Sequence, residues 1–132
     1  MVGKPIIPDS MRGSYEAFQF APATRVGDLL ILSGQIGVGP DGNAIADLEA
    51  QFTRAFELIG QILHEAGLSF DNIVDLHTFH VGLQAHLGTF MKVKAKYITE
   101  PFPSWTAIGV VELALPGIAV EIKATAAYTN LH

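Results

Sequence analysis

The sequence predicts an α+β fold in which one sheet carries its helices on a single face. Apolar residues recur at helical spacing over residues 47–66, and two expected strands precede this helix. A third strand, a second helix and two further strands follow it. This order lacks the strict strand and helix alternation of a doubly wound fold, so we expect the helices to cover one side of the sheet.

Turn residues divide the first part of the chain. Residues 1–16 contain proline and glycine without a sustained period, and they are expected to form an irregular N-terminal arm. A strand is expected over residues 18–24, and the following Gly27-Asp28 pair suits a hairpin turn. The next strand, residues 29–36, is apolar on both faces and therefore needs cover on both sides.

The long helix begins at a suitable N-cap, Asp47, and Gly67 suits its end. We expect a core strand over residues 73–81 and a second helix over residues 84–98, which prolines then stop.

The last two strands are expected over residues 106–113 and 118–128. In the final strand the apolar residues share one face, and Glu121, Lys123 and Thr125 occupy the other.

The composition indicates one associating domain. Its 132 residues show no repeat or linker, so residues 1–132 are expected to form a single unit. Only 16% of the residues are charged and 49% are hydrophobic, which is a large apolar fraction for so small an interior. Association between copies of the chain is therefore expected.

Several function classes are disfavoured. The chain has no cysteine, which excludes disulfides, thiolate nucleophiles and cysteine metal sites. Its net charge of -5 argues against a nucleic-acid partner, and only the cluster of Lys92, Lys94 and Lys96 is basic. No apolar run reaches the roughly 20 residues of a membrane span, and no signal segment is recognisable. A cytoplasmic location without a membrane partner is expected.

Cofactor and metal sites are not expected either. His77 and His80 are three residues apart on a strand, so they face opposite sides of the sheet and cannot share a metal ion. The spaced glycines of residues 34–39 precede a turn instead of the helix that a dinucleotide fingerprint needs. Ser33 lies in no nucleophile-elbow pattern.

Three ordered segments resemble the RidA/YjgF family, which is also known as the endoribonuclease L-PSP family. They are GDLLILSGQI at residues 27–36, PFPSWTA at residues 101–107 and VEIKA at residues 120–124. The resemblance implies a chorismate-mutase-like α+β fold that forms a homotrimer through its sheets, with a ligand pocket at each subunit interface. The best-studied members hydrolyse reactive enamines and imines.

The resemblance also implies which residues form the site. Trp105 stands where deaminating relatives keep an arginine that pairs with the substrate carboxylate, as in a YjgH-like branch that lacks this arginine. Glu121 stands where they keep a glutamate that positions the attacking water, which makes it the candidate catalytic residue. From the strand pattern alone, Glu121 could equally be a solvated carboxylate or one paired with Lys123. Trp105 could simply fill a gap between subunits.

Four further positions complete the predicted ligand-binding set. Phe20 and Lys94 stand where the family has a tyrosine and an asparagine, Ser33 keeps the family serine, and Ala107 follows Trp105 in the same segment. Lys94 could supply the missing positive charge or be a solvated helix residue. An indole offers a flat face and one N–H donor, so a flat neutral or cationic ligand is expected.

Three functions remain in order of preference. The first is a homotrimer that binds a small metabolite between subunits without the usual 2-imino acid deaminase activity. The second is an enamine or imine deaminase with a non-standard substrate, in which Lys94 or the backbone replaces the arginine. The third is RNA cleavage, which needs a basic surface that this composition does not supply.

Overall fold

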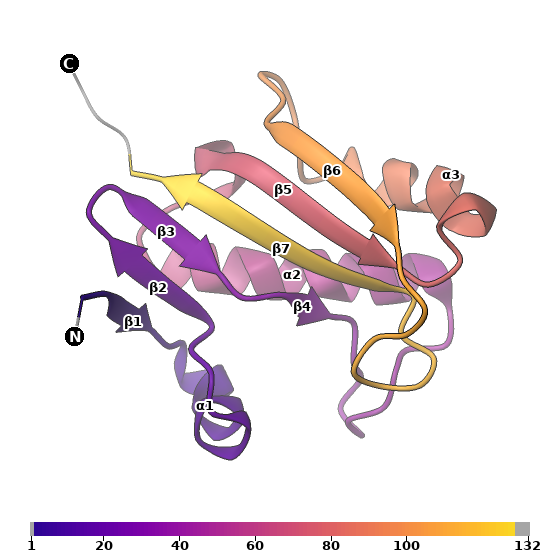
Figure 1. Cartoon of the computed structure of the whole chain (residues 1–132), viewed down its shortest axis with the longest axis horizontal. Coiled ribbons are helices and arrows are strands. Elements are labelled where there is room, and N and C mark those ends of the chain that lie inside the picture. The colour runs from indigo at the N-terminus through magenta and orange to yellow at the C-terminus, as the bar shows by residue number, and fades with distance from the viewer. Residues whose placement is uncertain (1, 129–132) are drawn as a thin grey trace.

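The computed structural model describes residues 2–128, which form an α+β fold around one mixed sheet (Figure 1). The sheet order is β1-β2-β3-β7-β5-β6, and β4 pairs separately with β7. β5 and β6 run parallel, and the other pairs run antiparallel. The strands are β1 (Lys4–Ile6), β2 (Ala23–Val26), β3 (Leu29–Leu32), β4 (Gln35–Ile36), β5 (Ile73–His80), β6 (Ser104–Gly109) and β7 (Val120–Ala127).

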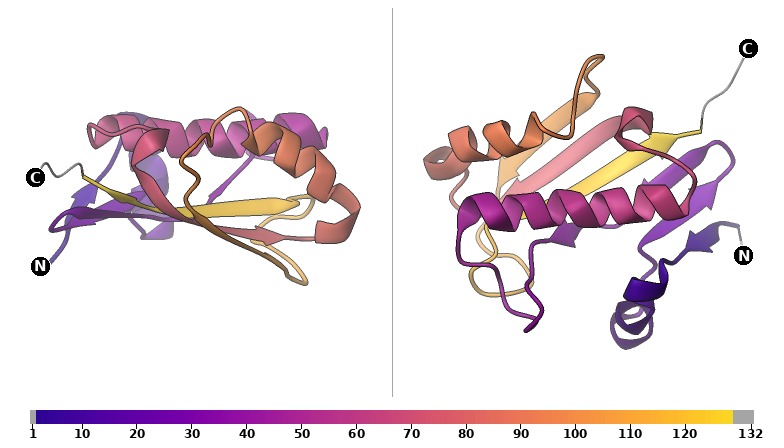
Figure 2. Two further views of the ribbon diagram at one scale, coloured as in Figure 1. Left: turned by 90° about the horizontal axis from the view of Figure 1, so that it is seen from above. Right: turned by 180° about the vertical axis from the view of Figure 1, so that it is seen from behind.

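Two helices cover one face of the sheet, as predicted. α2 (Leu48–Glu65) and α3 (Leu83–Lys94) lie behind the sheet in Figure 1 and on one side of it in Figure 2. The predicted caps of the first are confirmed, because the Asp47 carboxylate accepts a hydrogen bond from the Ala50 amide at 2.9 Å. Gly67 follows the helix with a φ of +79°.

The core lies between these helices and the sheet. Its largest fully buried apolar side chains come from α2, α3, β3, β5 and β7, and they are Phe52, Phe56, Phe90, Leu30, Leu32, Ile59, Ile62, Leu63, Leu76 and Ile122. The predicted alternation of the last strand is confirmed, since its even-numbered residues are buried under the helices and its odd-numbered residues are only partly buried. Glu121 therefore belongs to the outer face of the sheet.

The N-terminal segment is not the irregular arm that its prolines and glycines indicate. It forms the edge strand β1, a 3-10 turn η1 (Asp9–Met11) and the short helix α1 (Arg12–Phe18). The helix buries none of its residues, so it carries no apolar period that could have revealed it. It ends at Gln19, whose φ of 63° is left-handed. The strand expected at residues 18–24 therefore begins later, at Ala23, as β2.

Three other boundaries differ from the expectation. The single apolar strand expected at residues 29–36 is interrupted at Ser33 and Gly34, and its two parts, β3 and β4, pair separately with β7. α3 ends at Lys94 instead of residue 98, and β6 ends at Gly109 instead of residue 113. A 3-10 turn, η2 (Phe70–Asn72), precedes β5.

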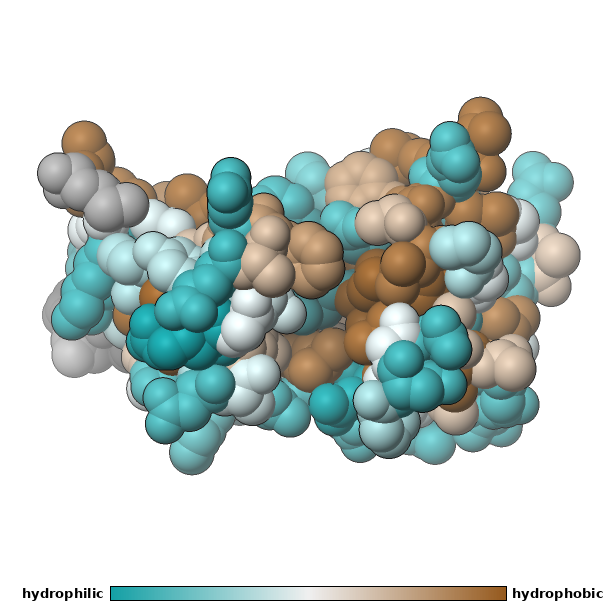
Figure 3. Space-filling model, turned by 90° about the horizontal axis from the view of Figure 1, so that it is seen from below, coloured by the Kyte–Doolittle hydropathy of each residue, from teal (hydrophilic) through white to brown (hydrophobic). Residues whose placement is uncertain are grey.

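Gln51 fastens two loops at one end of the sheet. Its fully buried side-chain amide donates to the carbonyls of Ile45 and Gly117 at 2.9 and 3.0 Å, and its oxygen accepts from the Ala119 amide at 2.8 Å. The loops that follow β4 and β6 are thereby held beside the start of β7. Viewed from below in Figure 3, the part of the molecule that carries these loops shows an apolar patch among polar residues, whereas the part with α1 is more hydrophilic.

The outer face of the sheet carries exposed apolar side chains. Leu29, Ile31 and Ile108 are 45%, 41% and 45% exposed. The cover expected on both sides of β3 is therefore present only on the helix side of this chain. No helix within residues 2–128 is both long enough and apolar enough to cross a membrane.

Candidate functional site

The predicted site residues fall into two groups, of which Trp105, Ala107 and Lys94 form the first. On β6, Trp105 lies opposite Leu76 and Ala107 opposite Thr78 of the neighbouring strand. Leu76 and Thr78 are fully buried beneath the helices, so Trp105 and Ala107 also face the helix side. The indole is half-buried beside Phe90 of α3, with 6.1 Å between the ring centroids. Trp105 therefore packs at the edge of the core.

Lys94 lies over the Trp105 ring. Its ammonium nitrogen is 4.3 Å from the ring centroid, which is a cation–π contact. Partial burial removes water from the ammonium and lowers the pKa of Lys94. Within residues 2–128, no carboxylate forms an ion pair with it. The Lys94 ammonium thus contacts the Trp105 ring, and no carboxylate in the described part of the chain neutralises its charge.

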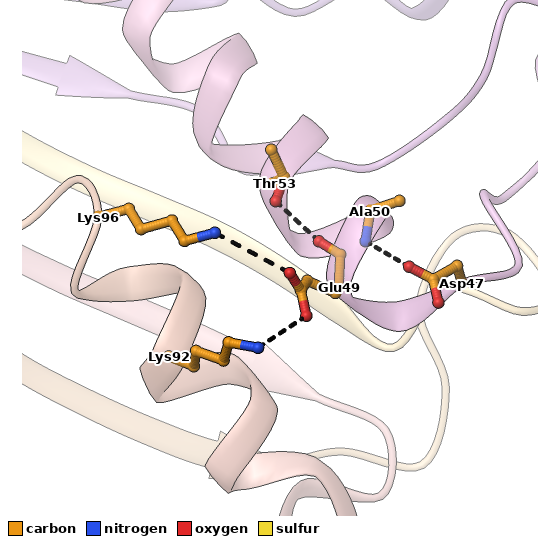
Figure 4. Close-up of polar contacts among 6 residues, drawn as sticks. All are labelled: Asp47, Glu49, Ala50, Thr53, Lys92 and Lys96. Carbon is orange, nitrogen blue, oxygen red and sulfur yellow. Dashed lines mark hydrogen bonds and ion pairs between the residues drawn. The ribbon is translucent and has the colours of Figure 1, made fainter.

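The neighbouring lysines behave differently. Lys92 of α3 and Lys96, which follows the end of that helix, lie 3.4 and 3.9 Å from the two carboxylate oxygens of Glu49 on α2 (Figure 4). Both lysine side chains are more than half exposed, so these ion pairs contribute little to stability. The basic cluster of the sequence is therefore divided between a surface ion-pair network and the candidate site.

Behind Trp105 lies a buried polar chain that sequence reasoning missed. The indole N–H donates to Thr78 Oγ1 at 3.0 Å, Thr78 Oγ1 is 2.8 Å from His80 Nε2, and His80 Nδ1 is 3.0 Å from His86 Nε2. Burial, with a smaller repulsion from His86, lowers the pKa of His80 to about 4, and burial also lowers the pKa of His86. The sequence could have indicated this chain through the alternation of β5, because Thr78 and His80 lie at even positions on the same buried face as Leu76.

Glu121, Ser33 and Phe20 form the second group. The Glu121 carboxylate lies directly against Gly34, where any Cβ would clash with it. Ser33 Oγ donates to the Ala21 carbonyl at 2.6 Å, and Phe20 is 41% exposed. Glu121 and Ser33 therefore lie at the interruption between β3 and β4, and Phe20 directly precedes the residue that Ser33 contacts.

Glu121 is not paired with Lys123, which was one reading of the strand pattern. The Lys123 ammonium donates instead to the Leu32 carbonyl at 3.0 Å. Among the described residues none makes a hydrogen bond or ion pair with the Glu121 carboxylate, and the side chain is half-buried. The carboxylate is thus held by packing and keeps its acceptor positions free.

The two groups lie on opposite faces of one sheet. Phe79 is paired with Glu121 on one side and with Ile108 on the other, and these three share the outer face. Trp105 has the opposite parity on β6 from Ile108 and faces the helices. One chain therefore does not place Trp105 beside Glu121. A surface hollow of about 630 Å³ lies elsewhere, between α2 and residues 8–10, and contains none of the six candidate residues.

The described histidines do not all gather at one place. His77 is exposed and lies 3.1 Å from Asp75, whereas His80 is fully buried on the other face, as their spacing predicts. Across residues 2–128, no three histidine or acidic side chains come close enough to share a metal ion.

Comparison with known proteins identifies the family. The family model described as Endoribonuclease L-PSP matches residues 14–128. The RutC family protein YjgH of Escherichia coli (strain K12) is 36% identical over 122 residues, which cover 92% of either chain. This chain belongs to the RidA/YjgF family.

Solved structures support the same conclusion for the fold of this RidA/YjgF protein. A structure of protein YjgH matches with a TM-score of 0.89 and 32% identity, covering 99% of this chain and 100% of the other.

A further relative was found by sequence. The 2-iminobutanoate/2-iminopropanoate deaminase of Salmonella typhimurium is 36% identical over 113 residues, which cover 81% of this chain and 85% of the deaminase. The predicted family and α+β fold are confirmed.

Proposed function

We propose that this RidA/YjgF protein is a homotrimer that binds a small metabolite between its subunits and lacks the usual 2-imino acid deaminase activity. The observation that carries the proposal is the contact of the Lys94 ammonium with the ring of Trp105, the residue that stands where the family has its arginine. Glu121 on the opposite face completes the pocket when it comes from a neighbouring copy.

Assembly through the outer face of the sheet accounts for both the surface and the site. The exposed side chains of Leu29, Ile31 and Ile108 form an apolar surface that a second copy would cover. Contact between copies is also the simplest way to bring the Trp105 group of one chain to the Glu121 group of another. The sheet face and the divided site thus support the same arrangement.

Lys94 changes the class of ligand expected. A cationic ligand on the indole would be repelled by the ammonium that already lies over the ring, so a cationic ligand is disfavoured. The indole N–H is also taken by Thr78 and is not available as a donor. We therefore expect a flat ligand that places an acceptor oxygen beside Lys94.

The missing arginine argues against the usual deaminase reaction. A bidentate arginine–carboxylate contact contributes about 1.5 to 3 kcal/mol, and its loss weakens binding roughly ten- to a hundredfold. Lys94 can return the charge but not the two parallel hydrogen bonds, because its ammonium is a flexible point charge. A small 2-imino acid would be held loosely and in no fixed orientation for attack by water.

Three ring compounds that differ in charge test the proposed ligand class. Benzoate and benzamide are expected to raise the melting temperature and to change the emission of the only tryptophan more than benzamidine does. Lys94→Met removes the acceptor's partner and is expected to abolish the advantage of benzoate. Lys92→Met, on the same helix, is the matched control and leaves the ranking unchanged. A preference for benzamidine, or an unchanged ranking in Lys94→Met, would contradict the proposal.

The second candidate function is an imine or enamine deaminase with a non-standard substrate, and the position of Lys94 over Trp105 favours it. Our proposal predicts that ammonia release from 2-aminoacrylate-type imines is no faster with this protein than with an inert protein. Trp105→Arg alone is not expected to restore full activity, because Phe20 and Lys94 still differ from the family pattern. Turnover that Glu121→Gln abolishes would establish the deaminase instead.

A further inference from the structure

Trp105 is connected to the buried histidines by a continuous chain of hydrogen bonds. The chain runs from β6 through Thr78 and His80 of β5 to His86 of α3. Thr78 and His80 are fully buried, and His86 is 6% exposed. Each hydrogen bond is 2.8 to 3.0 Å long, so the side chains from β6, β5 and α3 are held in fixed positions relative to one another.

The chemistry of the four groups fixes the direction of this chain. An indole nitrogen only donates, so Thr78 Oγ1 accepts from Trp105. The buried hydroxyl proton of Thr78 then goes to His80 Nε2, which is its remaining polar contact among the described residues. His80 Nε2 must therefore be unprotonated, and His80 carries its proton on Nδ1, from which it donates to His86 Nε2. Both histidines are neutral in this arrangement.

We propose that Thr78, His80 and His86 are positioning residues that hold the Trp105 indole by its N–H and keep the ring beneath Lys94. Because the indole N–H is used inside the protein, ligand selection depends on the ring and the ammonium and not on a donor from Trp105. This inference rests on the proposed function only in taking Trp105 as part of the pocket wall.

The ligand-free protein allows a test that does not depend on binding. Its only tryptophan gives one indole N–H signal in a nitrogen–proton NMR spectrum. Thr78→Val keeps the shape but removes the acceptor, and it is expected to shift this signal and to speed its exchange with water by about tenfold, as loss of one hydrogen bond implies. Thr78→Ser is expected to restore the parent behaviour. Thr106→Val, an exposed neighbour on the other face of β6, is the control.

The histidine tautomers give a second readout at neutral pH in the unaltered protein. Long-range nitrogen–proton spectra are expected to show His80 protonated at Nδ1 and unprotonated at Nε2. A proton on His80 Nε2 would overturn the proposal, and so would an indole signal that is identical in Thr78→Val and the parent. If both readouts agree with the proposal but no flat ligand binds, the positioning role stands and the proposed function fails.

Discussion

Replacing Gln51 with leucine is expected to lower the free energy of unfolding by about 3 kcal/mol. Leucine has a similar volume, so the change removes hydrogen bonds without opening a large cavity. It leaves the Ile45 and Gly117 carbonyls and the Ala119 amide without their partner, and each such group contributes a penalty of roughly 1 kcal/mol or more when it stays dry. The loops beside β7 should loosen together.

Urea unfolding at a fixed protein concentration measures this effect, since assembly would make stability depend on concentration. Gln61→Leu is the matched control, because Gln61 lies on the same helix but is exposed, with a single weak contact to Ser10 at 3.4 Å. Its expected effect is within about 0.5 kcal/mol. Equal effects of the two substitutions would show that Gln51 does not fasten the loops.

Lowering the pH from 7 to 4 is expected to remove about 3 kcal/mol of stability through His80 alone. Burial lowers the folded-state pKa of His80 from 6.5 to about 4, so the unfolded chain takes up a proton first as the pH falls. The lost stability accumulates between these two pKa values and levels off below the folded one. The lowered pKa of His86 adds a loss in the same direction.

Unfolding free energies at several pH values between 7 and 4 test this linkage. In His80→Gln the decline with falling pH is expected to be shallower than in the parent protein, whatever the absolute stability of the variant. His64→Gln, which changes an exposed histidine on α2, should keep the parent slope. A parallel decline in all three proteins would place the acid sensitivity elsewhere.

Local patterns predicted those parts of the fold that depend on burial within one element. The alternation along residues 118–128 predicts the two faces of β7, and the period of residues 47–66 predicts α2 and its caps. α1 could not be predicted, because it buries no side chain and so has no apolar period. The buried role of Gln51 could not be predicted from the sequence of α2, because its three hydrogen-bond partners lie in loops outside the helix.

The candidate site was predicted as a set of residues but not as a geometry. The sequence places Glu121 on the last strand and Trp105 just before the strand expected at residues 106–113, whereas the structure includes Trp105 in β6. The opposite faces of the two residues depend on how β6, β5 and β7 pair across long sequence separations. Lys94 over the indole likewise depends on how α3 packs against the sheet. Contacts between distant segments of the chain depend on tertiary packing, and the spacing of apolar residues within one segment gives no information about that packing.

The pocket between copies is tested most directly by cross-linking Trp105 to Glu121. The natural chain has no cysteine, so Trp105→Cys combined with Glu121→Cys gives two defined thiols on opposite faces of each subunit. Light scattering should first show three copies of the 14.2 kDa chain. A short bismaleimide is then expected to give covalent two-chain and three-chain species with the double variant, whereas either single variant stays largely uncoupled. A monomer at micromolar concentration, or a trimer whose double variant does not cross-link, would contradict a site shared between subunits.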